Sequence, residues 1–362
     1  MHNKQVNLLK IFYKEWLTPL IILLCIYLIS FFPTVIEKYY SNGIYLYISY
    51  ILRSISGSVS FSIGDVLYII LVGYLLVQGI KFFAILFSKE RRKDFFKYIL
   101  QTAKKALWLI IFFQILWGMN YYRIGVTHQL NIPKNDYTKE DVESLVCDLV
   151  QKLNTIRPAI GRNELPQPSF ENIIEESILL HDSLRMKNNL LNYKKASVKK
   201  SIFSKYGHYI GFVGYYNPFT AEAQLSVDVP KVLAPYIVCH EIAHQLGYAA
   251  EDEANFVGYL SCSQSNNPYF KYSVYLDLYR YAAIELLMMN ETNTHKWELD
   301  TLVQNDLKDI RKFFLAKANN ISPTFSAIYN QYLKANRQSK GLSSYNNVIG
   351  LLISKKKKYG NI

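Results

Sequence analysis

The sequence predicts a mostly α-helical protein in which three membrane-spanning helices precede a soluble α+β domain. Three apolar runs, each near the roughly 20 residues that a bilayer span requires, occupy residues 16–36, 65–87 and 106–122. The remaining residues are more polar, carry apolar positions at helical spacing and include one pair of β-rich segments. We therefore predict a membrane region over residues 1–122 and a separate domain over residues 123–362.

The first apolar run follows a basic N-terminus, as the apolar core of a secretory signal also does. It is longer than the roughly 7 to 15 residues usual for such a core. Moreover, Phe31, Phe32 and Pro33 are bulky where a cleavage site needs small residues. We therefore expect a retained helix rather than a cleaved signal.

The net charge of +13 is concentrated in three segments. Residues 1–16 carry +2, residues 88–105 carry +5 and residues 331–362 carry +7, which leaves −1 for the rest of the chain. The first two segments flank predicted spans, whereas a nucleic-acid site would interleave basic and aromatic residues within a folded domain. We therefore expect the lipid bilayer as a partner and exclude nucleic acid.

The basic loop between the second and third spans sets the predicted orientation. Seven Lys and Arg residues lie between Lys89 and Lys105, against only Glu90 and Asp94, so the positive-inside rule places this loop in the cytoplasm. Counting spans from the loop puts residues 123–362 on the extracytoplasmic face.

Between the first two spans, isoleucine and leucine recur at helical spacing among tyrosines, at Ile44, Ile48, Ile51, Leu52 and Ile55. This pattern is typical of an amphipathic helix that lies on a membrane surface. The alternative is an ordered loop.

The soluble domain is predicted to begin with a helix whose start is marked by Thr138 and Asp141, the spacing of a capping box. Proline, glycine and hydrophobic periodicity then divide the rest of the domain. The first helix is expected to stop by Pro158. It is followed by a helix over residues 171–191, strands over 209–216 and 223–229, helices over 232–246 and 251–262, and further helices from Tyr269 onward.

The strongest chemical signal is the segment His240-Glu241-Ile242-Ala243-His244 within a predicted helix. Two histidines four residues apart project from one helix face with Cβ atoms about 5–6 Å apart, so both imidazoles can bind one metal ion. Glu241 lies about 100° round the helix, where its carboxylate can act as general base on a metal-bound water. This pattern predicts a catalytic zinc ion and a hydrolytic reaction, because zinc lowers the pKa of bound water to about 7.

A catalytic zinc site usually has three protein ligands, so one is still missing. A third histidine six residues after the second is absent, because that position is Ala250. Glu251 and Glu253 are the candidates, and Glu251 is preferred because it shares a helix face with Asn255, which can hydrogen-bond a ligand. Glu253 remains the alternative.

The segment Glu251-x-x-Ala254-Asn255 resembles the element that follows the two histidines in gluzincin-type zinc metallopeptidases. The spacing from His244 to Glu251 is shorter than is usual in that group. The resemblance implies a zincin-like domain with His240, His244 and Glu251 as metal ligands and Glu241 as the catalytic residue.

The chain as a whole resembles an uncharacterised family of bacterial membrane proteins with three N-terminal spans and a domain of unknown function. The resemblance rests on the segments 214–220, 222–224, 239–247 and 251–260. It implies a multi-pass protein of the bacterial inner membrane.

Several further residues are weaker candidates. The segment from Tyr215 to Val227 is expected to form either an edge strand that holds a peptide or a core hairpin, and Glu222 is expected to be exposed on it. Candidates for stabilising an oxyanion, none identified by spacing, are His208, Tyr216, Tyr272, Tyr275 and Arg280. His181, alone on a helix pattern, is expected to be packing material.

The sequence therefore favours a membrane-anchored zinc-dependent peptidase acting in the cell envelope on a peptide or protein substrate. The alternative is a catalytically inactive membrane protein that uses the zinc-bound domain as a binding or structural module. Glu241 favours the enzyme, because a structural zinc site needs a fourth ligand and no general base.

Overall fold

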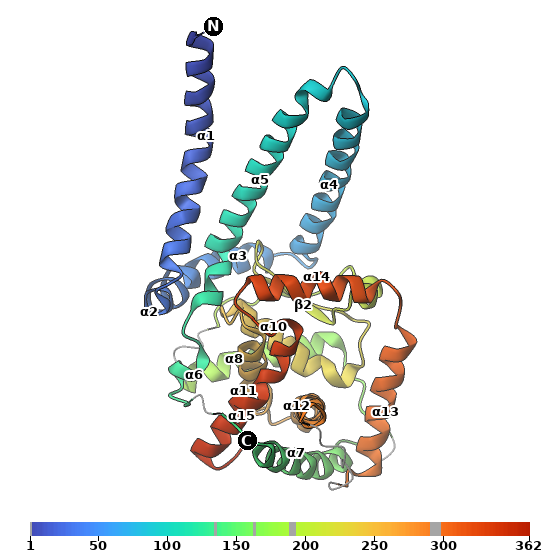
Figure 1. The fold of residues 1–362 in the computed structure, drawn as a ribbon. Helices are drawn as coiled ribbons and strands as arrows, with labels where there is room; N and C mark the ends of the chain where they lie inside the picture. Colours follow the sequence, from blue (N-terminus) through green and yellow to red (C-terminus); the bar gives the residue numbers. More distant parts are fainter. Residues whose placement is uncertain (1, 134–135, 162–163, 188–192, 290–297) are drawn as a thin grey trace.

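The computed structural model describes residues 2–133, 136–161, 164–187, 193–289 and 298–362. Helices hold 73% of the chain, so the mostly helical class predicted from the sequence is confirmed. Long helices project from one side of a helical domain that holds one small sheet (Figure 1).

Two helical segments are long and apolar enough to cross a membrane, namely α4 (Ile63–Phe87) and the segment Arg92–Leu116, which contains α5 (Phe95–Leu116). A third span exists if the bent pair Glu15–Ile29 and Pro33–Ser56 counts as one, with 99° between its two parts. The N-terminus and the loop joining α4 to α5 lie at the ends of these helices away from the domain (Figure 1). The two basic segments thus lie on the far side of the candidate membrane from the domain.

The predicted bounds of the first and third spans need correction. The first helix, α1 (His2–Ile29), ends before the bulky Phe31-Phe32-Pro33 segment, and Pro33 starts the short α2 (Pro33–Val35). The third ends at Leu116, because Trp117 leaves the helical conformation with φ −158° and packs against the domain. Hydropathy alone does not register such local breaks.

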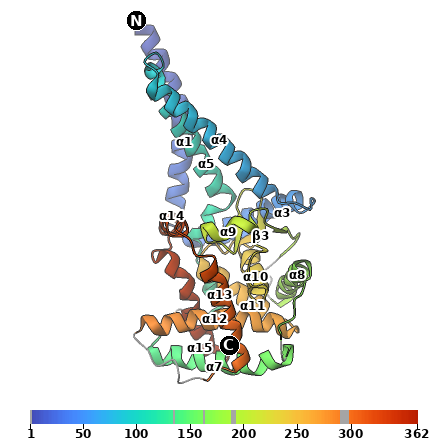
Figure 2. The same cartoon turned by 90° about the vertical axis from the view of Figure 1, so that its right-hand side faces the viewer.

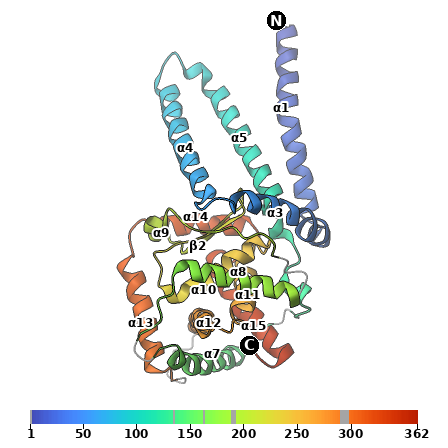
Figure 3. The same cartoon turned by 180° about the vertical axis from the view of Figure 1, so that it is seen from behind.

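The predicted amphipathic helix is present as α3 (Tyr45–Ser56), which follows a π-helical segment, Ile36–Ile44. Its outward residues are apolar, with Tyr47, Ile51 and Ile55 exposed. The residues that α3 buries against the domain include Tyr45, Ser49 and Arg53. The helix lies across the base of the long helices (Figure 3).

Buried carboxylates join the long helices to the domain. Glu222, expected to be exposed, is fully buried, because its carboxylate accepts hydrogen bonds from the backbone N–H groups of Ile63 (3.0 Å) and Gly64 at the start of α4. Glu37, just after α2, accepts from the Arg123 guanidinium at 2.7 and 3.0 Å. These contacts fix the domain against the bases of α1 and α4.

Most of the remaining elements are helices that enclose the domain core. The capping box predicted at Thr138 and Asp141 is present at the start of α7. The helices are α6 (Val126–Gln129), α7 (Lys139–Ile160), α8 (Phe170–Lys187), α9 (Ser204–Ile210), α10 (Ala234–Gln245), α11 (Glu251–Cys262), α12 (Pro268–Met288), α13 (Thr301–Ala316), α14 (Ser322–Ala335) and α15 (Val348–Tyr359). In the core, α12 packs along α7, and α10 packs against both α8 and α11 (Figure 2).

The sheet has three short strands in the order β1 (Val198–Lys200), β3 (Glu222–Leu225), β2 (Gly214–Asn217). β1 runs parallel to β3, and β2 runs antiparallel to it with Tyr215 opposite Gln224. The β-rich pair predicted from the sequence is thus present, although its first segment was placed too early, because Tyr209 and Ile210 end α9. β2 is an edge strand next to α10.

Candidate metal centre

Two consecutive helices position the residues of the predicted metal site. α10 carries His240, Glu241 and His244, and it ends at a turn where Gly247 adopts φ +85°, a conformation that suits glycine. The chain reverses and enters α11 at Glu251. The Tyr236 hydroxyl donates to the Asn255 carbonyl at 3.0 Å, which holds the two helices together.

Three ligand atoms converge between these helices. His240, His244 and Glu251 each offer one atom, and all three atoms lie within 4.8 Å of one another. Glu251 Oε2 lies 3.3 Å from His240 Nε2 and 3.5 Å from His244 Nε2. All three residues are buried, so the structure brings together a group that could hold a metal ion.

Hydrogen bonds orient both imidazoles toward this point. His240 Nδ1 lies 2.8 Å from Asn255 Oδ1, and His244 Nδ1 lies 2.7 Å from the Tyr248 carbonyl. Because both partners are acceptors, each Nδ1 must carry a proton, and each ring turns its Nε2 toward Glu251. Each Nε2 offers a lone pair to a metal ion when its ring is neutral. Asn255 thus hydrogen-bonds His240, one of the two histidines predicted to bind the metal.

The carboxylate of Glu251 completes a cluster of acceptors. Its Oε1 accepts a 2.8 Å hydrogen bond from the Tyr329 hydroxyl, whereas its Oε2 is buried and has no hydrogen-bond donor among the described residues. The Nε2 atoms of two imidazoles and one carboxylate oxygen therefore face one another, and no other described residue donates a hydrogen bond to that oxygen. A buried arrangement of this kind requires a cation, either a proton or a metal ion.

The pKa shifts of His244 and Glu251 also show that this group favours a positive charge beside the carboxylate. Burial lowers the pKa of His244, but the Glu251 carboxylate outweighs this effect and raises the pKa to about 9. Burial raises the pKa of Glu251, yet the two histidines hold it far below its usual range. This buried group of side chains therefore favours an anionic Glu251 beside a positive charge.

Glu241 lies on the neighbouring side of α10 and points toward strand β2. A Cβ atom at Gly214 would lie 2.7 Å from Glu241 Oε1, so a larger residue there would have to displace this carboxylate. Burial raises the pKa of Glu241 to about 7, and its Oε2 has no hydrogen-bond partner within the described part of the chain. A carboxyl group with a pKa near neutrality can both accept and release a proton.

Glu253, the alternative ligand, lies elsewhere. Its Oε1 accepts a 3.1 Å hydrogen bond from the Val126 backbone N–H, and it is absent from the group of converging atoms. Because residues two apart on a helix point about 200° away from each other, α11 cannot direct both Glu251 and Glu253 toward His240.

Of the candidates for oxyanion stabilisation, Tyr216 is the one that the structure places beside the metal residues, with its ring centroid 6.3 Å from that of His244. Tyr272 donates to Asp306, Tyr275 lies in the helical core and Arg280 pairs with Asp277. The side chain of His208 lies outside the described residues.

Two tyrosines that sequence reasoning missed also adjoin the group. Tyr329 lies on α14, and Tyr345 stacks on His240 with 6.1 Å between ring centroids. In a chain with thirty tyrosines, no spacing signal distinguishes these two.

Residues at the bases of the long helices also contact the end of α10. Trp117 Nε1 donates to the His244 carbonyl at 3.2 Å, and the Tyr45 hydroxyl donates to the Gln245 carbonyl at 3.0 Å. These bonds satisfy carbonyl groups that the helix end leaves free. The candidate metal centre therefore lies directly beneath the bases of the long helices.

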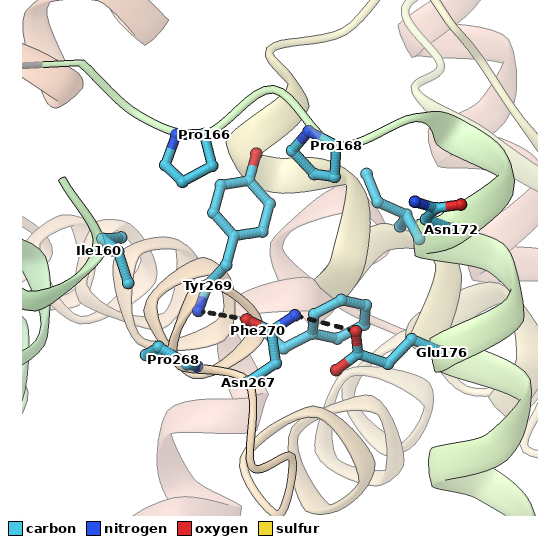
Figure 4. A pocket seen from close by; sticks show the side chains of 10 residues that line it. Ile160, Pro166, Pro168, Asn172, Glu176, Asn267, Pro268, Tyr269 and Phe270 are labelled. Carbon is cyan, nitrogen blue, oxygen red and sulfur yellow. Dashed lines mark hydrogen bonds between the residues drawn. The ribbon is translucent and has the colours of Figure 1, made fainter.

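One of the cavities of the domain lies apart from this group. It measures about 320 Å³ and is bounded by the segment around Pro166 and Pro168 and by the start of α12 (Figure 4). Within it, Asn267 donates to Glu176 at 2.9 Å. No candidate metal ligand lines this cavity.

The family model for DUF3810, described as a protein of unknown function, matches residues 40–353. The chain belongs to this family. The match covers the candidate membrane helices α4 and α5 together with all the residues of the candidate metal centre. No curated protein and no solved structure matches the chain significantly.

Proposed function

We propose that this DUF3810 protein is a membrane-anchored, zinc-dependent peptidase of the bacterial inner membrane that hydrolyses peptide bonds in the cell envelope. One observation carries the proposal. His240 Nε2, His244 Nε2 and Glu251 Oε2 converge in one buried group that could hold a metal ion, and Glu241 lies next to them on α10. Three protein ligands and an adjacent carboxylate are the composition of a catalytic rather than a structural zinc site.

The donor set favours zinc. Two neutral imidazoles and one carboxylate are ligands that zinc accepts readily in catalytic sites, where a fourth position stays open. A zinc ion held there would lower the pKa of a coordinated water and polarise a substrate carbonyl. The remaining chemistry belongs to side chains of this chain.

Glu241 is assigned to proton transfer. Its buried Oε2 is free to accept a proton from the attacking water and to release it to the nitrogen of the leaving amine. The hydrogen bonds from Asn255 and Tyr248 to the histidines, and from Tyr329 to Glu251, would keep the three ligands in place.

The edge strand supports a polypeptide substrate. The Ser226 N–H donates to the Val213 carbonyl at 3.0 Å, so the alternation of an antiparallel pair turns the backbone groups of Gly214 and Tyr216 away from β3. These groups lie on the strand that passes Glu241, where an extended peptide can pair with them. The helix pair and this edge strand are the basis on which we assign the domain to the zincin-like class.

The deciding experiment compares the wild-type protein with Glu241→Gln. Both should contain one zinc ion when purified, because Glu241 is not a proposed ligand. Sequencing of new N-termini in envelope proteins should then find cleavage products in wild-type cells that are missing in Glu241→Gln cells. Loss of zinc from the variant would refute the role of Glu241, and identical sets of N-termini would refute the peptidase.

The same experiment tests the alternative, a zinc-bound module without catalysis. That reading requires bound zinc in both proteins and no difference between their N-termini.

The placement of the domain has its own test. The basic loop between α4 and α5 lies at the far ends of these helices from the domain, which supports an extracytoplasmic domain. Protease added to intact spheroplasts should digest residues 123–362 and spare the loop. Protection of the domain would reverse the proposed orientation.

A further inference from the structure

Helix α14 presents its apolar side outward. Five large apolar or aromatic residues form one stripe at the spacing i, i+4, i+7, i+8 and i+11. All five are exposed, and Ile328 is the most exposed at 61%. They are Ile321, Phe325, Ile328, Tyr329 and Tyr332.

The side of α14 that faces the domain is largely polar. Ser322, Ser326 and Asn330 are partly buried there, and Leu333 is the one apolar residue of the helix that is fully buried. A helix on the surface of a soluble domain shows the opposite arrangement, with its apolar stripe toward the core. The stripe of α14 therefore faces an apolar surrounding other than the domain core.

The position of α14 identifies that surrounding. The helix lies across the face of the domain from which α1, α4 and α5 project (Figures 1, 2 and 3). Tyr332, a member of the stripe, packs on Phe113 with ring centroids 6.3 Å apart, and Phe113 lies within one turn of the end of α5. Just beyond α14, Arg337 donates to the Ser30 carbonyl at the end of α1 (3.0 Å). The stripe is thus continuous with the ends of two long helices.

A neighbouring helix extends the same surface. The Ser322 hydroxyl donates to the Tyr209 carbonyl of α9 at 3.2 Å, and Tyr206 and Tyr209 are exposed there. Ile202, just before α9, is 52% exposed, and its N–H donates to Asp65 near the start of α4 at 2.7 Å. Aromatic residues of this kind are enriched at membrane–water interfaces.

We propose that α14 lies in the plane of the bilayer interface and inserts Ile321, Phe325 and Ile328 among the lipid chains. The rings of Tyr329 and Tyr332 lie beside them, with their hydroxyls bonded within the protein. The occupant of this surface is lipid, because the stripe continues from the bases of the candidate spans. One member of the stripe, Tyr329, also donates to Glu251. The candidate metal centre would then lie one hydrogen bond away from a lipid-bound helix, at the level of the membrane surface.

The test uses spin labels on the full-length protein in lipid nanodiscs, with Cys25 and Cys147 replaced by serine because both are exposed. One label is attached to Ile328→Cys. The matched control is Ala327→Cys, because Ala327 is next to Ile328 in the sequence and is exposed on another side of α14. A third label at Leu287→Cys marks an equally apolar position, 56% exposed, on α12 away from the long helices. Accessibility to oxygen, which dissolves in lipid, is compared with accessibility to a water-soluble nickel chelate.

The ratio of oxygen to nickel accessibility should be severalfold higher at Ile328→Cys than at either control. An equal or lower ratio at Ile328→Cys would overturn the proposal. Protection of Ile328→Cys from both reagents would also overturn it, because a protein partner would then cover the stripe. The measurement requires no hydrolysis, so it can succeed or fail independently of the proposed peptidase activity.

Discussion

The Tyr329 hydroxyl donates a 2.8 Å hydrogen bond to Oε1 of Glu251, a residue 78 positions earlier in the sequence, and so connects α14 to α11. Glu251 is the carboxylate that faces both histidines of α10. The bond takes up the oxygen that does not face the histidines. It therefore orients Oε2 toward the position proposed for the metal.

Removal of this hydrogen bond should weaken zinc binding without removing a ligand. Tyr329→Phe keeps the ring but not the donor, so zinc affinity should fall by the roughly 10–100-fold typical of such supporting contacts. Competition with a chromophoric chelator measures this change. Tyr332→Phe is the control, since its hydroxyl pairs with Tyr121 and not with Glu251. Equal zinc affinity of wild type and Tyr329→Phe would show that the bond does not orient the ligand.

The two glutamates at the start of α11 should respond differently to loss of charge. Glu251→Gln removes the proposed anionic ligand, so zinc affinity should fall well beyond about 100-fold, the upper range for supporting residues. Glu253→Gln should keep its zinc, because the replacement amide oxygen can still accept from the Val126 N–H. Metal content is measured on both purified variants at a pH where the histidines of the apo protein have released their protons. Zinc lost only from Glu253→Gln would reverse the ligand assignment.

The buried pair between Arg123 and Glu37 should matter for stability. Their side chains are only 3% and 9% exposed, and Arg123 also donates to the Gly247 carbonyl at 3.0 Å. Arg123→Met leaves the Glu37 carboxylate buried without its counter-ion, so the free energy of unfolding should fall by about 3–5 kcal/mol. Guanidinium unfolding in detergent provides the measurement.

The matched control is Lys312→Met, which breaks an exposed ion pair with Asp309. Exposed pairs contribute about 0–1 kcal/mol, so this variant should unfold close to the wild type. Similar losses in both variants would contradict the structural role of the buried pair.

His181 should make the domain sensitive to acid. Burial lowers the pKa of His181 to about 4, only partly offset by hydrogen bonds that include the one to the Ser177 carbonyl. The unfolded chain takes up this proton near pH 6.5, whereas the folded chain resists it. Stability is therefore unaffected above pH 6.5 and should be lost as pH falls toward 4, by about 3 kcal/mol in total.

Unfolding of wild type and His181→Gln between pH 8 and pH 4 separates this residue from the carboxylates that titrate in the same range. The variant should lose less stability over that interval. An identical pH dependence in both proteins would show that His181 does not contribute to it.

Local sequence signals located several elements well. The capping box at Thr138 and Asp141, the acidic start of α11 at Glu251 and the glycine after α10 each act within a few residues, so their effects could be predicted without tertiary information. The same holds for His240 and His244, whose four-residue spacing places them on one side of any helix.

Contacts between residues far apart in the sequence contradicted two predictions made from local signals. The local pattern predicts Glu222 on an exposed strand, but backbone N–H groups at the start of α4 donate to its carboxylate and Glu222 is buried. The helix of the third apolar run, α5, ends at Leu116 rather than Tyr122, because Trp117 leaves the helix and donates to the His244 carbonyl. Each partner lies more than a hundred residues away in the sequence.

Local patterns in the amino-acid sequence predicted that one helix would present two histidines and a glutamate, and that apolar segments long enough for a bilayer precede it. The choice between Glu251, which the sequence favoured, and Glu253 depended on the folded arrangement. The contact of Tyr329 with Glu251 and the outward apolar side of α14 could not be predicted from the sequence. Helical periodicity specifies which residues share a side of one helix. It does not specify which other element that side meets, because this depends on how all the helices pack together.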